Sequence, residues 1–186
     1  MSRDGTGDAW KHRQSKRKGG FTGIPREFTE RKLKVEPQFT FKELFIMPFT
    51  QKRRYSEEGV VSYVPIEQNL PPTGIHIFDA YLQYLADGGS DLQAFVDRYG
   101  MRRNDIDSLV FVLTGMKGVD FRLQYQRWTA WYLLLYTDMT IADVAKRSGI
   151  GSANNLYLTF KRDYNLSPGY YRNQHRKNGD VGRYKL

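Results

Sequence analysis

The strongest constraint in this sequence is a glycine between two short runs of apolar residues, within residues 140–172. On both sides of Gly149 the apolar residues follow the i, i+3, i+4 spacing of an amphipathic helix: Ile141, Val144 and Ala145, then Leu156 and Phe160. Glycine tolerates the positive φ that a chain reversal needs, so Gly149 predicts a turn. Thr140 followed by Asp143 is a helix-start signal, and Ser167-Pro168 starts a closing helix. Two helices joined this way form a helix-turn-helix, whose second helix fits the DNA major groove.

The same plan occurs earlier in the chain. Before the turn, the matching residues lie at an offset of 49: Leu92, Phe95, Val96, Gly100 and Met101 with Ile141, Val144, Ala145, Gly149 and Ile150. After the turn the offset is 50: Ile106, Val110, Gly115 and Met116 with Leu156, Phe160, Asn165 and Leu166. Ser90, with Gln93 three residues later, supplies the predicted start signal of the earlier copy. The chain therefore contains two predicted helix-turn-helix units.

A long helix is predicted between the two units. Apolar and aromatic residues recur at helical spacing from Val119 to Leu135: Phe121, Tyr125, Trp128, Tyr132 and Leu135. Such a helix would be about 25 Å long and would set the distance between the units. The aromatic stripe could stack on bases, but its helical period favours packing in the core.

Composition limits the classes of function. The 186 residues carry a net charge of +9, and the pI is about 9.7, which favours a polyanionic partner such as nucleic acid. Cysteine is absent, which excludes disulfides and thiolate metal sites and fits a reducing cytoplasm. The first residues lack the apolar run of a secretory signal, and the longest apolar run, Ala130–Tyr136, is too short to cross a bilayer.

The first 75 residues differ from the rest. Residues 1–20 are polar and basic, and this arm could track phosphates or simply be solvated; its cations are Lys11, Arg13, Lys16, Arg17 and Lys18. Residues 21–75 show no helical period. A short extended stretch is predicted around Phe39, Phe41 and residues 45–49, with Pro48 confining it to an edge. Pro71-Pro72 is the predicted connector to the helical region.

Residues 76–174 resemble the DNA-binding domain of the AraC/XylS family of bacterial transcription regulators. The resemblance rests on these motifs: Ala130-x-x-Leu133-Leu134, Ile141-Ala142-Asp143-Val144-Ala145, Gly149-Ile150, Phe160-Lys161, Leu166-Ser167-Pro168 and Tyr171-Arg172. It implies an all-α, seven-helix domain with two recognition helices in neighbouring major-groove segments. The sequence pattern before this domain predicts a mostly irregular N-terminal region. The expected divisions are a basic arm and irregular extension (1–75), a first unit (76–118), a linker helix (119–136), a second unit (137–176) and a basic tail (177–186).

The second recognition helix is expected from about Ser152 to Asp163, with Leu156 and Phe160 facing the core. The resemblance places these residues at DNA-facing positions: Ala153, Asn154, Tyr157, Leu158 and Lys161. Asparagine can pair with adenine N6 and N7, so Asn154 is the first candidate for base reading, Asn155 the second, and helix capping is the alternative for both. Leu158 stands where many relatives carry arginine, which leaves contact with a thymine methyl. The predicted phosphate contacts are Thr140, Lys161, Arg162 and Arg172.

The first recognition helix, about residues 102–113, departs from the family pattern. Arg102, Arg103 and Asn104 are its candidates for base contact, since cations at a helix N-terminus gain from a nearby anion. The alternative is that Asp105 and Asp107 neutralise the two arginines. Residues 76–130 hold six Lys/Arg against seven Asp, whereas residues 131–186 hold nine against four. The second unit is therefore the expected anchor on DNA.

No enzyme or metal signature is found. His12, His76 and His175 are isolated, and no phosphate-binding glycine loop follows a strand, so we expect neither catalysis nor a cofactor. Residues 1–75 are too few for the effector-binding barrel of many relatives, which predicts a monomeric, effector-independent regulator. The expected partners are double-stranded DNA and RNA polymerase, and the expected place is the cytoplasm, on the nucleoid. The alternative is a weakly selective architectural or interaction protein of a mobile element.

Overall fold

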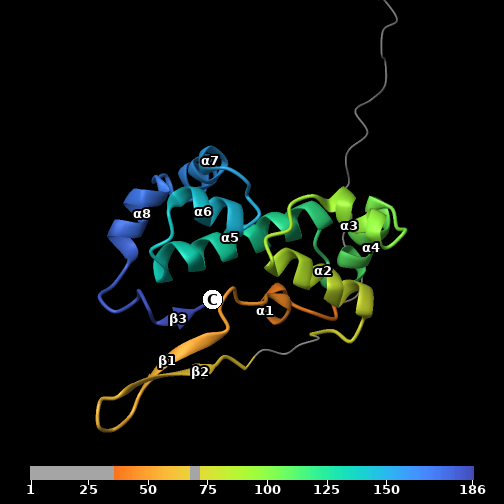
Figure 1. The fold of residues 1–186 in the computed structure, drawn as a ribbon. Helices are drawn as coiled ribbons and strands as arrows, with labels where there is room; N and C mark the ends of the chain where they lie inside the picture. The colour runs from red at the N-terminus through yellow and green to blue at the C-terminus, as the bar shows by residue number, and fades with distance from the viewer. Residues whose placement is uncertain (1–35, 68–71) are drawn as a thin grey trace, which may run out of the picture. The chain divides into compact units, whose positions relative to one another are not determined.

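The computed structural model describes residues 36–67 and 72–186, so the predicted arm at residues 1–20, His12 and Pro71 lie outside the described residues. From Pro72 onward the chain is mostly helical (Figure 1). Its helices are α2 (His76–Ala86), α3 (Leu92–Arg98), α4 (Arg103–Thr114), α5 (Gly118–Tyr136), α6 (Ile141–Arg147), α7 (Ala153–Tyr164) and α8 (Pro168–His175). The all-α class is thus confirmed, apart from one small sheet. No helix among the described residues is long and apolar enough to span a membrane.

The N-terminal region contains regular elements that the sequence did not predict. A helical turn, α1 (Phe41–Leu44), is followed by a hairpin of β1 (Gln51–Tyr55) and β2 (Val61–Pro65). β1 also pairs with β3 (Tyr184–Lys185), and the sheet order is β2-β1-β3, antiparallel throughout.

The prediction of an extended stretch around Phe39–Phe49 was wrong. Residues 41–44 are helical because Thr40 and Glu43 form a capping box, in which the Thr40 amide donates to the Glu43 carboxylate at 2.7 Å. The strands lie later in the chain. In the sequence of β1, three consecutive cations hide the alternation between more buried and more exposed residues. The remote partner of β1 completes the sheet: the Thr50 amide donates to the Lys185 carbonyl at 2.8 Å.

The two predicted helix-turn-helix copies share their turn geometry. Gly100 and Gly149 both have positive φ, 64° and 77°, as predicted. The matched ends of α4 and α7 are also left-handed, with φ 72° at Gly115 and 58° at Asn165. The start signals at Thr140 and Ser167 are confirmed, since each side chain accepts a backbone N–H of the first helical turn.

The start of α3 corrects one prediction. Asp91, not Ser90, is its N-cap, because the Asp91 carboxylate accepts the amides of both Gln93 and Ala94.

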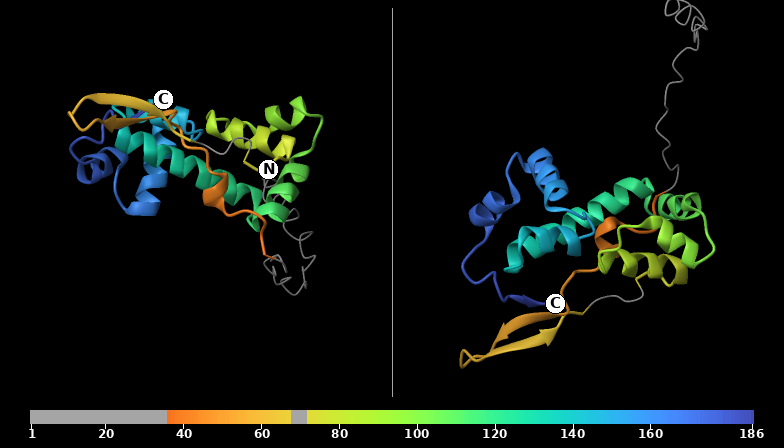
Figure 2. Two further views of the ribbon diagram at one scale, coloured as in Figure 1. Left: turned by 90° about the horizontal axis from the view of Figure 1, so that it is seen from below. Right: turned by 45° about the horizontal axis from the view of Figure 1, so that its top comes forward.

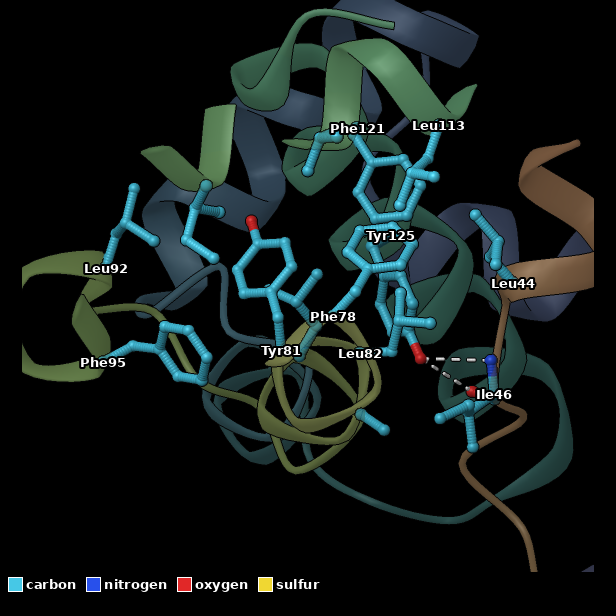
Figure 3. Packing of buried hydrophobic residues seen from close by; sticks show 14 of the residues in the cluster. Leu44, Ile46, Phe78, Tyr81, Leu82, Leu92, Phe95, Leu113, Phe121 and Tyr125 are labelled. Atoms are coloured by element: carbon cyan, nitrogen blue, oxygen red, sulfur yellow. Dashed lines mark hydrogen bonds between the residues drawn. The ribbon is translucent and has the colours of Figure 1, made fainter. Parts of the chain in front are cut away.

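The core consists of two hydrophobic clusters along α5. One lies among α1 to α5 and the other among α5 to α8. Phe121 and Tyr125 on α5 are fully buried in the first, and Leu133 and Leu134 in the second. Figure 3 shows the Tyr125 hydroxyl joined to the backbone of Ile46, whose amide donates to it at 3.0 Å. Burial raises the pKa of Tyr125, so the hydroxyl stays neutral.

A segment of the N-terminal region, residues 39–49, lies along α5 and contacts both clusters (Figure 2). We call it the clasp. Its aromatic residues meet the aromatic stripe of α5: Phe41 lies 5.3 Å from Phe121, Phe45 5.0 Å from Tyr125 and 5.2 Å from Trp128, and Phe49 6.4 Å from Tyr132, between ring centroids. The prediction that the stripe packs in the core is confirmed.

Candidate nucleic-acid interface

The helix α7 is amphipathic and presents one face to solvent. Its N-terminus is capped by Ser152, whose Oγ accepts the Asn155 amide at 3.1 Å. Leu156 and Phe160 are 0% and 1% exposed and anchor the helix in the second cluster. The opposite face carries the predicted contact residues in exposed positions: Ala153, Asn154, Asn155, Tyr157, Leu158, Lys161 and Arg162. This face is therefore accessible to a partner.

The two adjacent asparagines have different surroundings. The Asn154 side chain is exposed and makes no hydrogen bond within the described part of the chain. Asn155 instead donates from Nδ2 to the Ile150 carbonyl at 3.3 Å, across the turn. Neither amide caps the helix, since Ser152 does so. Asn154 thus keeps both its donor and its acceptor free for a base edge, whereas Asn155 shares its donor with the turn.

The same exposed face of α7 also carries Leu158 and two cations. Leu158 is 56% exposed and lies beside a groove between α5 and α7, which Leu123, Gln126 and Asn155 also line. Lys161 donates to the Asn165 carbonyl at 3.1 Å, and Arg162 pairs with Asp163 at 2.8 Å. Both cations stay exposed, so these contacts leave them accessible to phosphate.

Thr140, a predicted phosphate contact, is exposed at the start of α6. Its hydroxyl accepts the Asp143 amide at 3.1 Å and donates to the Asp143 carboxylate at 2.6 Å. The hydroxyl proton is therefore held by the cap.

The N-terminus of α4 is also exposed, but acidic residues accompany its cations. The Arg102 amide donates to Asp105 at 2.9 Å, which is the main reason why the pKa of Asp105 is lowered, and the Arg102 guanidinium lies 3.5 Å away. Arg103 donates to Gln93 at 2.8 Å, and Asn104 is exposed. The alternative that acidic residues neutralise the two arginines therefore holds for Asp105, which lies beside Arg102.

The same alternative does not hold for Asp107. Asp107 pairs with Arg122 of α5 at 3.2 Å, rather than with either arginine of the α4 N-terminus.

Comparison with known proteins agrees with this architecture. Residues 95–174 match the family model of a helix-turn-helix domain. This part of the chain is therefore similar to helix-turn-helix domains. No curated protein matches the chain.

Solved structures with a similar fold include the DNA-binding domain of AdpA, a global transcriptional factor crystallised with target DNA. It is 26% identical, with a TM-score of 0.45, and the match covers 54% of this chain and 89% of that one. The C-terminal domain of AraT, a response regulator from Geobacillus stearothermophilus, is 16% identical, with a TM-score of 0.47. That match covers 56% of this chain and 86% of the AraT domain. The xylose-binding activator xylR is 20% identical, with a TM-score of 0.44, and this chain spans 56% of its own length but 28% of that activator.

In this helix-turn-helix domain, Arg172 has an internal role that sequence reasoning missed. Its Nε donates to the Leu134 carbonyl at 3.1 Å and its Nη2 to the Met139 carbonyl at 2.7 Å. Burial lowers the pKa of Arg172. The guanidinium therefore satisfies carbonyls at the end of α5, where a helix leaves acceptors unpaired.

Arg176, one helical turn further on, does the same. It donates to the carbonyls of Leu134 and Leu135, each at 2.9 Å, as well as to Thr137, and it pairs with Asp138 at 2.8 Å. The i, i+4 spacing of the two arginines was the available signal, since it places both on one face of α8. Among residues 36–67 and 72–186, no group of three or more metal-ligating side chains gathers.

Proposed function

We propose that this chain is a sequence-specific, DNA-binding transcription regulator, anchored on DNA by α7 in the major groove. The observation that carries the proposal is the exposed face of α7, with the unpaired amide of Asn154 beside the accessible cations Lys161 and Arg162. An amide of this kind supplies base reading, and the cations supply phosphate attraction.

The proposed contacts differ in kind. Ala153, Asn154, Tyr157 and Leu158 meet base edges, and Asn155 contributes its carbonyl oxygen. At α4, we include Arg102, Arg103 and Asn104 as weaker contacts, because Asp105 lies beside them. Lys161, Arg162 and Thr140 meet phosphates. Arg172 is left out of the set, because carbonyls of the α5 end occupy its guanidinium.

One chain supplies both recognition helices, which supports a monomer that needs no small effector and whose activity follows its abundance. RNA polymerase is the proposed protein partner, on the nucleoid in the cytoplasm. Sedimentation tests the monomer, and DNA binding without added small molecules tests effector independence. A stable dimer, or an affinity that changes with an effector, overturns that part.

The alternative is a weakly selective architectural protein, and the acidic residues of α4 favour it. Selection from randomised duplexes separates the two functions: a defined motif supports the regulator, and the absence of a motif supports the alternative.

The Asn154→Ala variant tests the role of α7. We expect it to weaken binding to the selected site by about 1–3 kcal/mol while leaving binding to random DNA unchanged. Titrations on both duplexes measure this. Asn178→Ala is the control, since Asn178 is equally exposed but lies outside α7. Equal losses on both duplexes would assign Asn154 to nonspecific binding and contradict base reading.

A further inference from the structure

We propose that Gly88 and Gly149 are positioning residues that hold the two helix-turn-helix units in one relative orientation. The contact lies between the loop joining α2 to α3 and the turn joining α6 to α7. Its consequence for DNA recognition rests on the proposed function, whereas the contact itself does not.

The backbone of the first unit touches the backbone of the second at Gly88. Gly88 has a φ of +83°, and a Cβ built there would lie 2.5 Å from the Arg147 carbonyl oxygen and 3.2 Å from its carbon. Both neighbours are main-chain atoms, which cannot rotate away as a side chain can. Any other residue at this position would separate the loop from the end of α6.

Gly149 completes the contact from the other side. It is buried, and a Cβ there would lie 3.1 Å from the Gly88 oxygen and 3.3 Å from the Gly89 oxygen. Gln126 of α5 joins them, since its Nε2 donates to the Gly149 carbonyl at 3.0 Å. The loop, the turn and the linker helix therefore meet at one point.

The matched glycine of the first unit shows that the helix-turn-helix does not itself require this contact. Gly100 occupies the corresponding turn with a similar φ, but it is exposed and its Cβ position faces open space. The turn requires only the positive φ. The crowding around Gly149 therefore serves contact between units.

The loop that carries Gly88 is itself well held. The Gly88 and Gly89 amides donate to the carbonyls of Leu85 and Tyr84 at 3.0 and 2.9 Å. Tyr84 covers Gly89, where a Cβ would fall 2.3 Å from the ring, and its hydroxyl donates to the Asp91 carbonyl at 2.7 Å. Because the conformation of this loop is fixed, its contact with the second unit also fixes where α2 and α3 lie relative to that unit.

A second attachment changes how the units move. Joined by α5 and the clasp alone, they could twist or bend about the ends of α5. With the loop seated on the turn, both of these motions would break contacts, so α4 and α7 keep one separation. A rigid pair of recognition helices accepts DNA segments at one spacing.

The chain has no cysteine, so spin labels can be placed at two introduced cysteines without interference. We choose Ser108→Cys on α4 and Ala153→Cys on α7, both exposed, and measure the distance distribution between the labels without DNA. We expect a narrow distribution that Gly88→Ala broadens or shifts. Gly74→Ala is the matched control, because Gly74 also flanks α2 and has a φ of +74°, with nothing near its Cβ position.

Circular dichroism verifies that each variant is folded. Gln126→Ala is a milder second variant, which removes the hydrogen bond without backbone strain, and we expect it to broaden the distribution less. If Gly88→Ala and Gln126→Ala both leave the distribution as Gly74→Ala does, the contact does not hold the units and the proposal is overturned.

Duplexes with altered spacing test the consequence for DNA. Inserting one base pair between the two contacted segments, about 3.4 Å along the axis, should weaken binding of the unmodified protein about tenfold, as one mismatched pair does. Gly88→Ala should reduce that penalty. A narrow label distribution without any spacing preference would contradict DNA reading by α4 while leaving the contact between units in place.

Discussion

At the scale of single residues, neighbouring side chains of one type have different tasks. Asn154 and Asn155 are adjacent on α7, but successive residues of a helix point about 100° apart. Asn155 therefore reaches back to the Ile150 carbonyl, while Asn154 extends into solvent. The family resemblance, rather than residue chemistry, predicted the order of the two candidates. The contact that separates them depends on the path of the turn, which spacing alone does not give.

Leu158 offers a gain-of-function test at this scale. It is 56% exposed, so Leu158→Arg removes little packing and adds two parallel donors suited to guanine. We expect the selected motif to acquire a guanine at one position, with a preference of about 1–3 kcal/mol. Repeating the duplex selection with this variant measures the change.

Leu158→Lys is the control for charge alone, because lysine adds the same charge without the planar fork. If Leu158→Arg and Leu158→Lys raise affinity equally on all duplexes and leave the motif unchanged, Leu158 does not face a base.

Among the secondary-structure elements, those of the two units were largely predictable. Local signals mark them: apolar period, start signals and turn glycines such as Gly100 and Gly149. The sheet was missed because the sequence of β1 shows no apolar alternation and its partner β3 lies at the other end of the described chain. Likewise, Arg172 was assigned to phosphate, since a sequence does not reveal that the end of α5 lies beside it.

The matched ends of α4 and α7 yield a prediction about stability. Asn165 adopts a φ of 58° where the other unit has Gly115. Asn165→Gly should keep or slightly raise the free energy of unfolding. Asn165→Ala should lower it by about 1 kcal/mol, because alanine has a Cβ but lacks the short polar side chain that lets asparagine adopt left-handed backbone. Denaturant titrations measure both. Equal stability of the two variants would show that the left-handed φ at this position does not affect the free energy of unfolding.

Over the whole of the described chain, α5 and the clasp run together along both hydrophobic clusters. Phe49 is the point where the clasp meets the sheet: its ring is fully buried, 5.0 Å from Tyr184 of β3 and 6.3 Å from Tyr136 of α5. Nothing near Phe49 in the sequence indicated these partners, of which Tyr184 comes from the other end of the described chain. The aromatic stripe on α5 predicted that something covers it, but not what.

Phe49→Ala tests the clasp. We expect a loss of about 3–5 kcal/mol in the free energy of unfolding, since a large buried ring leaves a cavity. Chemical denaturation measures the loss, and limited proteolysis should show earlier cleavage near β3. Tyr55→Ala, at an exposed ring of the neighbouring strand β1, is the control and should change stability little. Similar stability of both variants would mean that the second cluster holds together without the clasp.

The pairing of Gln51 with Lys185 also bears on the order of events during folding. Strands so distant in the chain must close a long loop before any hydrogen bond between them forms, and the entropy lost in closure is recovered only afterwards. Helices α2 to α8, built on local contacts, have no such delay. We therefore expect β3 to join the local β1–β2 hairpin only after the helical scaffold has formed.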